Sequence, residues 1–235
     1  MALRRIVLLG PPGCGKGTYA KHLAPILGSQ HVSTGDLIRA EIARGTHLGA
    51  RFQACSSEGR LVPDNLIFEL LEHVLRDSGT APVILDGFPR TVAQAERLQR
   101  AFPVQRVVSI NMRRDALVKK SVGRRVCAEC GMSFNLASVD ASEGFSAMPP
   151  MLPTKPECME RRCVERLEHR EDDTDAVVAR RLEVFEADTR PVLDFYRRLE
   201  VEGGGELMVV HVDIVGGYDA MAPVFERAVA FHPEN

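Results

Sequence analysis

A glycine-rich loop near the amino terminus constrains the fold more than any other feature of this sequence. Residues 5–9 (RIVLL) predict a buried strand, and residues 16–27 have the pattern of a helix. Between them, GPPGCGKGT at 10–18 contains four glycines. These let backbone N–H groups turn inward around an anion, and the helix N-terminus adds a positive dipole. With Lys16 as a movable positive charge, the stretch predicts a cradle for the phosphates of a nucleoside triphosphate.

Strand-like and helix-like segments alternate along the rest of the chain. Apolar runs rich in Val and Ile each precede a helical pattern: 82–86 before 91–101, 105–112 before 114–124, and 207–213 before 219–231. Strands that are apolar throughout are typical of a parallel sheet covered by helices on both faces, so the sequence predicts an α/β fold. Residues 173–199 predict one long helix, which Pro191 is expected to bend.

Two stretches interrupt this alternation. Residues 33–65 contain two helical patterns after a short strand-like segment, HVS. Residues 126–171 contain four cysteines and a Pro- and Met-rich segment, without convincing periodicity. Both stretches are therefore predicted to be insertions into the core domain.

Composition argues against several kinds of partner. The chain of 235 residues has a formal net charge of -2, so it has no bulk basic field for nucleic acid or anionic lipid. Its apolar runs are too short to span a bilayer. The first predicted strand begins so early that no signal peptide is expected before it. We therefore expect a cytoplasmic monomer with no nucleic-acid or membrane partner.

Asp86 ends the predicted strand 82–86 in the stretch VILDGFPRT. A carboxylate at the carboxyl edge of a parallel strand, beside a phosphate loop, is well placed to hold Mg²⁺ through water. The alternative for Asp86 is a strand-end cap.

Six motifs, in chain order, extend the pattern beyond a phosphate loop: GPPGCGKGT, VSTGDLIRAEI, SEGRLVPD, DGFPRT, VGRRVC and HREDDT. Together they resemble the adenylate kinase family of nucleoside monophosphate kinases, in its long-lid form. The resemblance implies a P-loop NTPase-like core with a five-stranded parallel sheet, formed by residues 1–32, 66–125 and 172–235. It also implies an AMP-binding helical domain at 33–65 and a lid at 126–171. The implied reaction is Mg-dependent, reversible phosphoryl transfer from ATP to AMP, which gives two ADP.

The resemblance also assigns the acceptor site. Arg39 and Arg90 would bind the acceptor phosphate, because a guanidinium is planar and bidentate. Leu61 and Val62 would contact base and ribose, and Gln94 would read the adenine edge. The AMP-binding residues implied in this way are Thr34, Gly35, Arg39, Leu61, Val62, Gly87, Arg90, Gln94, Arg170 and Arg181.

The donor site and the catalytic residues follow from the same resemblance. The implied ATP-binding residues are Gly10, Pro11, Pro12, Gly13, Cys14, Gly15, Lys16, Gly17, Thr18, Lys120 and Arg124, with Cys14 as a small space-filler. The residues implied to surround the transferring phosphoryl group are Lys16, Arg90, Arg124, Arg170 and Arg181. Asp172 and Asp173 resemble the lid hinge, with helix N-caps as the alternative. Lys120 occupies a position where the family commonly has an arginine stacked on the ATP base, which leaves donor selectivity open.

Two other functions remain open at this stage. A UMP/CMP kinase would share the fold, but Thr34 and Gln94 favour adenine. A catalytically inactive nucleotide-binding regulator would be expected to lack Lys16 or one of the arginines, and all are present. The acceptor in the implied reaction is already an anionic phosphate, so the reaction needs no general base, in keeping with a site rich in arginine.

The four cysteines of the second insertion leave its metal content undecided. Cys127 and Cys130 have the spacing of a zinc knuckle. Cys158 and Cys163 are separated by four residues, and 27 residues lie between Cys130 and Cys158. Zinc is possible, but this irregular spacing favours unligated thiols, which are stable in a reducing compartment.

Overall fold

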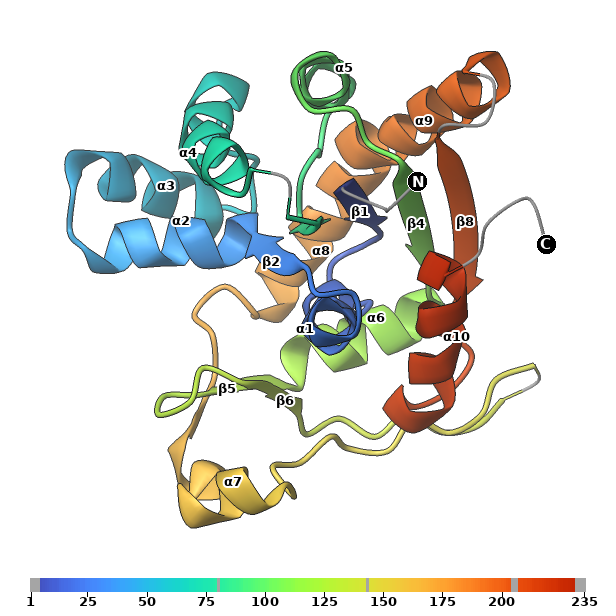
Figure 1. Ribbon diagram of the computed structural model, residues 1–235. Helices are drawn as coiled ribbons and strands as arrows, with labels where there is room; N and C mark the ends of the chain where they lie inside the picture. Colours follow the sequence, from blue (N-terminus) through green and yellow to red (C-terminus); the bar gives the residue numbers. More distant parts are fainter. Residues whose placement is uncertain (1–4, 80, 143, 204–206, 231–235) are drawn as a thin grey trace.

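A five-stranded parallel sheet lies at the centre of the protein (Figure 1). The computed structural model describes residues 5–79, 81–142, 144–203 and 207–230. The strands are β1 (Arg5–Leu9), β2 (Gln30–Ser33), β3 (Val83–Asp86), β4 (Arg106–Asn111) and β8 (Met208–Asp213), in the order β2-β3-β1-β4-β8. The predicted fold class is confirmed.

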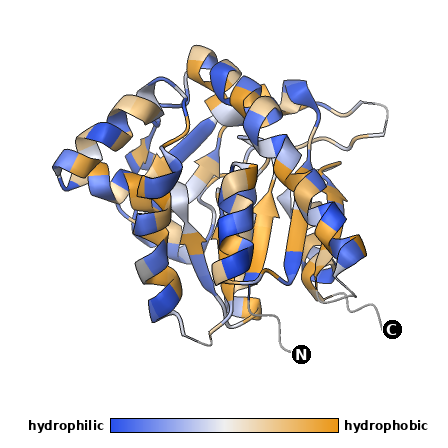
Figure 2. Ribbon diagram, turned by 90° about the horizontal axis from the view of Figure 1, so that it is seen from above, coloured by the Kyte–Doolittle hydropathy of each residue, from blue (hydrophilic) through white to orange (hydrophobic). Residues whose placement is uncertain are grey.

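Helices cover both faces of this sheet. In β1, Ile6 and Leu8 face one apolar cluster, and Val7 and Leu9 face the other. The first face carries α1 (Lys16–Ile26), α6 (Arg114–Val122), α8 (Asp175–Val184) and α10 (Tyr218–Ala230). The second carries α4 (Asp64–Asp77), α5 (Val92–Ala101) and α9 (Arg190–Glu202). The central strand β1 is therefore apolar on both sides, and Figure 2 shows orange arrows among the strands, between helices of mixed hydropathy.

The first insertion consists of α2 (Thr34–Ala43), α3 (His47–Ser57) and the start of α4. Hydroxyl side chains cap both of its first two helices, since Ser33 accepts from the Asp36 N–H and Thr46 from the Gly49 N–H. A Cβ at Gly49 would lie 2.4 Å from the carbonyl oxygen of Glu41. Glycine there lets α2 and α3 pack with their backbones in close contact.

The second insertion has two parts. A small antiparallel sheet contains β5 (Arg124–Cys127), β6 (Ser133–Asn135) and β7 (Leu167–Glu168), accompanied by α7 (Pro156–Glu160) and the 3-10 helix η1 (Cys163–Arg166). We call these elements the lid sheet. Residues 136–151, which we call the strap, leave the lid sheet and bury Val139 and Met148 in the apolar cluster of the core. The range expected for the lid thus contains a segment that packs on the core.

The long helix expected at 173–199 is interrupted. α8 ends at Val184, a π-helical turn η2 (Phe185–Thr189) follows, and α9 begins at Arg190. Pro191 lies in the first turn of α9, where its missing N–H is tolerated. The expected bend is thus replaced by a wider turn just before the proline. Within the described ranges, every helix is too short or too polar to cross a bilayer.

Candidate active site

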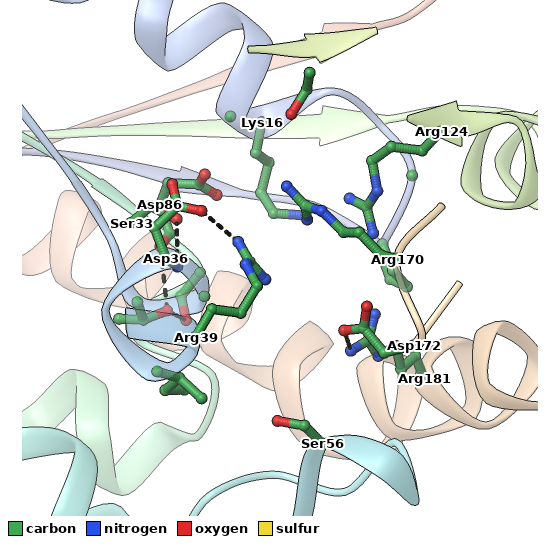
Figure 3. A pocket seen from close by; sticks show the side chains of 18 of the residues that line it. Lys16, Ser33, Asp36, Arg39, Ser56, Asp86, Arg124, Arg170, Asp172 and Arg181 are labelled. Carbon is green, nitrogen blue, oxygen red and sulfur yellow. Dashed lines mark hydrogen bonds and ion pairs between the residues drawn. The ribbon is translucent and has the colours of Figure 1, made fainter. Parts of the chain in front are cut away.

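A cleft of about 720 Å³ opens at the carboxyl ends of β1 and β3. It extends from the loop 10–18 to α2 and α3 on one side, and to the lid sheet on the other. Ligand sites of parallel sheets occur at this edge, because the loops that follow the strands meet there. Residues from all six sequence motifs therefore line one space (Figure 3), although Pro11, Cys14 and Asp173 do not line it.

The loop 10–18 has the geometry of an anion cradle. Gly13 and Gly15 have φ angles of 87° and 91°, and a Cβ at Gly13 would lie 2.3 Å from Ser121 Oγ. No side chain of the described residues caps the start of α1, so its first N–H groups remain available to a ligand. Lys16 Nζ lies over the loop and donates to the carbonyl oxygens of Gly10 and Pro11 at 2.7 and 2.9 Å.

Cys14 is a packing residue of this loop. Its side chain is fully buried, and burial raises the pKa of the thiol despite the opposing charge of Lys16. A Cβ at Gly10 would lie 2.8 Å from Cys14 Sγ. The neutral sulfur thus fills space beneath the cradle.

Asp86 lies beside the start of α1. Its Oδ2 would be 3.1 Å from a Cβ at Gly17, and it is 3.4 Å from His31 Nε2 on the neighbouring strand β2. A nearly buried carboxylate next to a phosphate cradle offers the oxygen ligand that Mg²⁺ prefers. No motif in the sequence pointed to His31, which reaches Asp86 only because β2 pairs with β3.

Cationic side chains from distant parts of the chain converge on the cleft. In Figure 3, Lys16, Arg39, Arg124 and Arg170 point toward a common space. Burial, together with the charges of Arg124 and Arg39, lowers the pKa of Arg170 to about 10. Burial and the charge of Arg181 likewise lower the pKa of Arg90. Such repulsion indicates a site built to receive anions.

Carboxylates hold several of these arginines in place. Arg124 Nε donates to Asp173 Oδ2 at 2.7 Å, and Asp173 is fully buried. Arg181 pairs with Asp172. The alternative in which these aspartates cap the helix is wrong, because Thr174 is the N-cap residue of α8 and accepts from the Val177 N–H.

At the acceptor end, Gln94 is almost fully buried. Its Nε2 donates to Asp64 Oδ1 at 2.6 Å, and its Oε1 accepts from the Arg90 N–H at 2.7 Å. Leu61 and Val62 line the cleft nearby. Asp64 is the last residue of the motif SEGRLVPD, but the motif assigned it no role. In the structure its carboxylate fixes the orientation of the Gln94 amide.

Thr34, Gly35 and Gly87 shape the turns that hold Arg39 and Arg90. Thr34 Oγ1 donates to the carbonyl oxygen of Gly87 at 2.9 Å. Gly87 has a φ of 78°, and a Cβ there would lie 2.7 Å from Thr34 Oγ1 and 3.0 Å from an Arg90 nitrogen. A Cβ at Gly35 would be 3.2 Å from Arg39. Small residues here leave room for both guanidinium groups.

Lys120 lines the cleft at its lid end. Its ammonium group, however, binds backbone carbonyl oxygens of the strap. Contact with a donor base stays a prediction for this residue.

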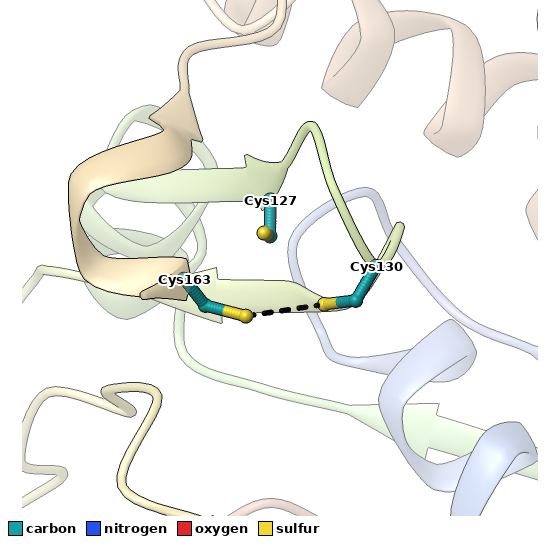
Figure 4. A group of neighbouring side chains, drawn as sticks. All are labelled: Cys127, Cys130 and Cys163. Carbon is teal, nitrogen blue, oxygen red and sulfur yellow. Dashed lines mark hydrogen bonds between the residues drawn. The ribbon is translucent and has the colours of Figure 1, made fainter. Parts of the chain in front are cut away.

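Three lid cysteines meet outside the cleft. The Sγ atoms of Cys127, Cys130 and Cys163 lie within 4.8 Å of one another, and Cys130 and Cys163 are 3.6 Å apart (Figure 4). Cys158 belongs to the same buried cluster. Three sulfur atoms gathered in this way, with a fourth cysteine buried in the same cluster, fit a structural zinc.

Comparison with known proteins agrees with this geometry. A family model described as adenylate kinase matches residues 8–201. A probable chloroplastic adenylate kinase 1 of Oryza sativa subsp. japonica is 43% identical over 197 residues, and the match covers 82% of this chain and 66% of that protein. A probable chloroplastic adenylate kinase 6 of Arabidopsis thaliana is 41% identical over 199 residues, which cover 82% of this chain and 65% of that protein. The chain thus spans slightly less than two thirds of these plant relatives.

A bacterial relative is covered more fully. The adenylate kinase of Moorella thermoacetica is 40% identical over 200 residues, which are 83% of this chain and 86% of that protein.

Proposed function

Because this chain belongs to the adenylate kinase family, we propose that it transfers a phosphoryl group reversibly from Mg·ATP to AMP and produces two ADP. The observation that carries the proposal is a single cleft in which a phosphate loop faces arginines from α2, the lid and α8. Two phosphate chains brought end to end need such an excess of positive charge.

The donor triphosphate binds to the loop 10–18 in this proposal. The N–H groups at the start of α1 and the ammonium of Lys16 bind its oxygens, and Arg124 and Arg170 reach them from the lid. Asp86 holds Mg²⁺ through water, and the ion, when bound, neutralises charge on the outer phosphates.

The acceptor AMP binds on the other side of the cleft. Arg39 and Arg90 bind its phosphate, while Leu61 and Val62 contact base and ribose. The Gln94 amide has two N–H groups and two lone pairs, of which Asp64 and Arg90 use one each. The remaining N–H and lone pair face the adenine edge.

Transfer requires positioning and charge stabilisation in this arrangement. The acceptor phosphate is an anion already, so no side chain has to remove a proton from it. Lys16, Arg90, Arg124, Arg170 and Arg181 stabilise the charge that develops on the equatorial oxygens. Closure of the lid excludes water and so suppresses hydrolysis of the donor.

For the lid, the three sulfur atoms of Cys127, Cys130 and Cys163, with Cys158 buried in the same cluster, support a structural zinc held by all four cysteines. Spacing alone favoured free thiols, whereas the short distances between sulfur atoms favour a metal. Its role would be to hold the lid sheet together, since a zinc with four protein ligands has no position open for chemistry.

The test is a panel of AMP, UMP, CMP and GMP with Mg·ATP. We expect AMP to be preferred, and we expect Lys16→Met to lower turnover by at least about 10²-fold while leaving thermal unfolding unchanged. Lys119→Met is the control, because Lys119 is exposed on α6 and does not line the cleft.

Three results would contradict the proposal. Preference for UMP or CMP would support the UMP/CMP kinase, and binding of nucleotides without transfer would support the inactive regulator. Near wild-type turnover of Lys16→Met would show that the loop 10–18 is not part of the active site.

We also infer a cytoplasmic monomer without nucleic-acid or membrane partners, and the net charge of -2 supports the absence of those two kinds of partner. The two plant relatives are chloroplastic by name. Gel filtration and localisation of a tagged chain test these expectations separately.

A further inference from the structure

The described residues of the strap, 136–142 and 144–151, are fastened to the core at several points. Val139 and Met148 pair through two backbone hydrogen bonds of 3.0 and 2.8 Å, and both side chains are almost completely buried among core residues such as Ile110 and Met221. In Figure 1 this yellow segment runs past α10, away from the lid sheet. The strap is therefore a hairpin-like extension that the core holds.

Further contacts hold the tip of the strap. The Ser146 N–H donates to the carbonyl oxygen of Val215 at 2.7 Å, and a Cβ at Gly217 would lie 3.1 Å from Pro149 Cδ. Arg113 donates to the carbonyl oxygen of Asp140 at 3.3 Å. The strap thus covers the turn that follows β8.

One end of the strap reaches the wall of the cleft, where Met151 lies beside Asn135 of β6. Asn135 and Met151 pair with each other through backbone hydrogen bonds of 2.9 and 2.8 Å, and both residues line the cleft together with Lys120. The acceptor side of the cleft lies at the opposite end, around Leu61 and Val62. Under the proposed function, the base of a donor bound at the loop 10–18 extends toward Asn135 and Met151.

Lys120 connects this wall to the strap. Its Nζ donates to the carbonyl oxygens of Ala137, Pro149 and Met148 at 3.0, 3.2 and 3.4 Å. An ammonium group has three N–H donors, and the three carbonyl oxygens match that number. Lys120 therefore joins the outgoing and returning arms of the strap.

We propose that Lys120 is a positioning residue that fastens the strap, and that Met151 at the end of the strap, paired with Asn135, forms the wall against which the donor base binds, rather than the Lys120 ammonium group. This inference rests on the proposed function for the identity of the donor. The family resemblance implies that the side chain at position 120 contacts the donor base directly. In this proposal Lys120 instead acts on the base indirectly, by holding the strap. Donor selectivity then depends on how rigidly the strap is held.

The first experiment measures hydrogen exchange of the strap amides in the nucleotide-free protein. Lys120→Met should speed exchange of the Val139, Ser146 and Met148 amides by about 10-fold or more. Lys120→Arg, which keeps donors for the carbonyl oxygens, should preserve their protection. Lys119→Met is the matched control and should leave exchange unchanged. Unchanged exchange in Lys120→Met would overturn the fastening role, whether or not the protein proves to be a kinase.

The second experiment titrates ATP alone and AMP alone into each variant by calorimetry. Lys120→Met should raise the Kd for ATP by about 10-fold, with the Kd for AMP within about 2-fold of wild type. Arg113→Met, which loosens the strap tip from outside the cleft, should raise the Kd for ATP in the same direction. In the double variant, the fold-increase in the Kd for ATP should be smaller than the product of the two single increases, because both substitutions act through the strap.

A direct contact between Lys120 and the base gives a different pattern. Arg113→Met would then leave the Kd for ATP unchanged while Lys120→Met raises it, and that outcome would overturn the proposal. These binding measurements do not depend on turnover. A failure of the proposed reaction can therefore be distinguished from a failure of the proposed role of the strap.

Discussion

The two stretches expected to be insertions, residues 33–65 and 126–171, are held in different ways. Ile38, Phe52 and Val62 of the first belong to the same apolar cluster as Val7 of the central strand β1. The lid sheet instead has a small cluster of its own, whose buried members are Cys127, Phe134, Cys158 and Cys163. One insertion shares the core of the protein, whereas the lid sheet has a separate one.

This difference determines how each part can move. Three short strands around four buried side chains do not have enough apolar area to be stable alone, so the lid sheet depends on the strap and on the proposed zinc. It can then open locally while the main core stays folded. Unfolding of residues 33–65 is coupled to global unfolding, because the apolar side chains of this segment belong to the main core.

Truncating the largest buried side chain of the helical insertion should produce the largest loss of stability. Phe52 is fully buried. Phe52→Ala should lower the free energy of unfolding by about 3–5 kcal/mol, since it opens a cavity in the shared core. Urea denaturation followed by circular dichroism measures this loss. A loss below about 1 kcal/mol would mean that the insertion opens independently.

The second prediction compares the two nucleotide sites. Gln94→Leu removes the amide at the acceptor end and should weaken AMP binding by about 1–3 kcal/mol, because a polar base edge is left unpaired. ATP binding at the loop 10–18 should change little. The variant also removes a donor from Asp64, so unfolding is measured alongside. Equal weakening of AMP and ATP would reject the role in reading adenine.

The third prediction tests the separate core of the lid sheet. Phe134→Ala removes its only buried aromatic side chain among the described residues of that cluster. The global free energy of unfolding should fall by less than about 1 kcal/mol, because the lid sheet already opens below the global transition. Hydrogen exchange of β5 and β6 should become faster. A loss as large as that of Phe52→Ala would show that the lid sheet and the main core unfold together.

The smallest global effect is expected from zinc removal. Protein purified without chelator should contain about one zinc per chain, and Cys127→Ser with Cys130→Ser should abolish it. Global unfolding should stay within about 0.5 kcal/mol, while trypsin should cleave faster at the exposed Arg161 and Arg162. Absence of zinc from the native protein would instead establish the free thiols that the spacing favoured.

Sequence motifs were informative wherever function depends on local backbone. The loop 10–18 is determined by glycines that reach positive φ and by a helix that starts immediately after them. The parallel sheet followed from strands that are apolar on both sides. For Arg39, Arg90, Arg124, Arg170 and Arg181, the family motifs identified the residues, and the structure brings all of them to one cleft.

Other features depend on contacts between distant segments, which no local pattern records. The Asp64 carboxylate meets Gln94 across 30 positions, and Lys120 meets the strap carbonyl oxygens across 17 to 29. Cys130 and Cys163 come together because β5 pairs with both β6 and β7, which brings the two halves of the lid sheet side by side. The sequence by itself therefore determined the phosphate cradle, the fold class and the identity of the charged residues. Tertiary structure decided how the strap attaches the lid sheet to the core and which groups form hydrogen bonds with Gln94 and Lys120. These contacts depend on the packing of distant segments rather than on periodicity or backbone preference.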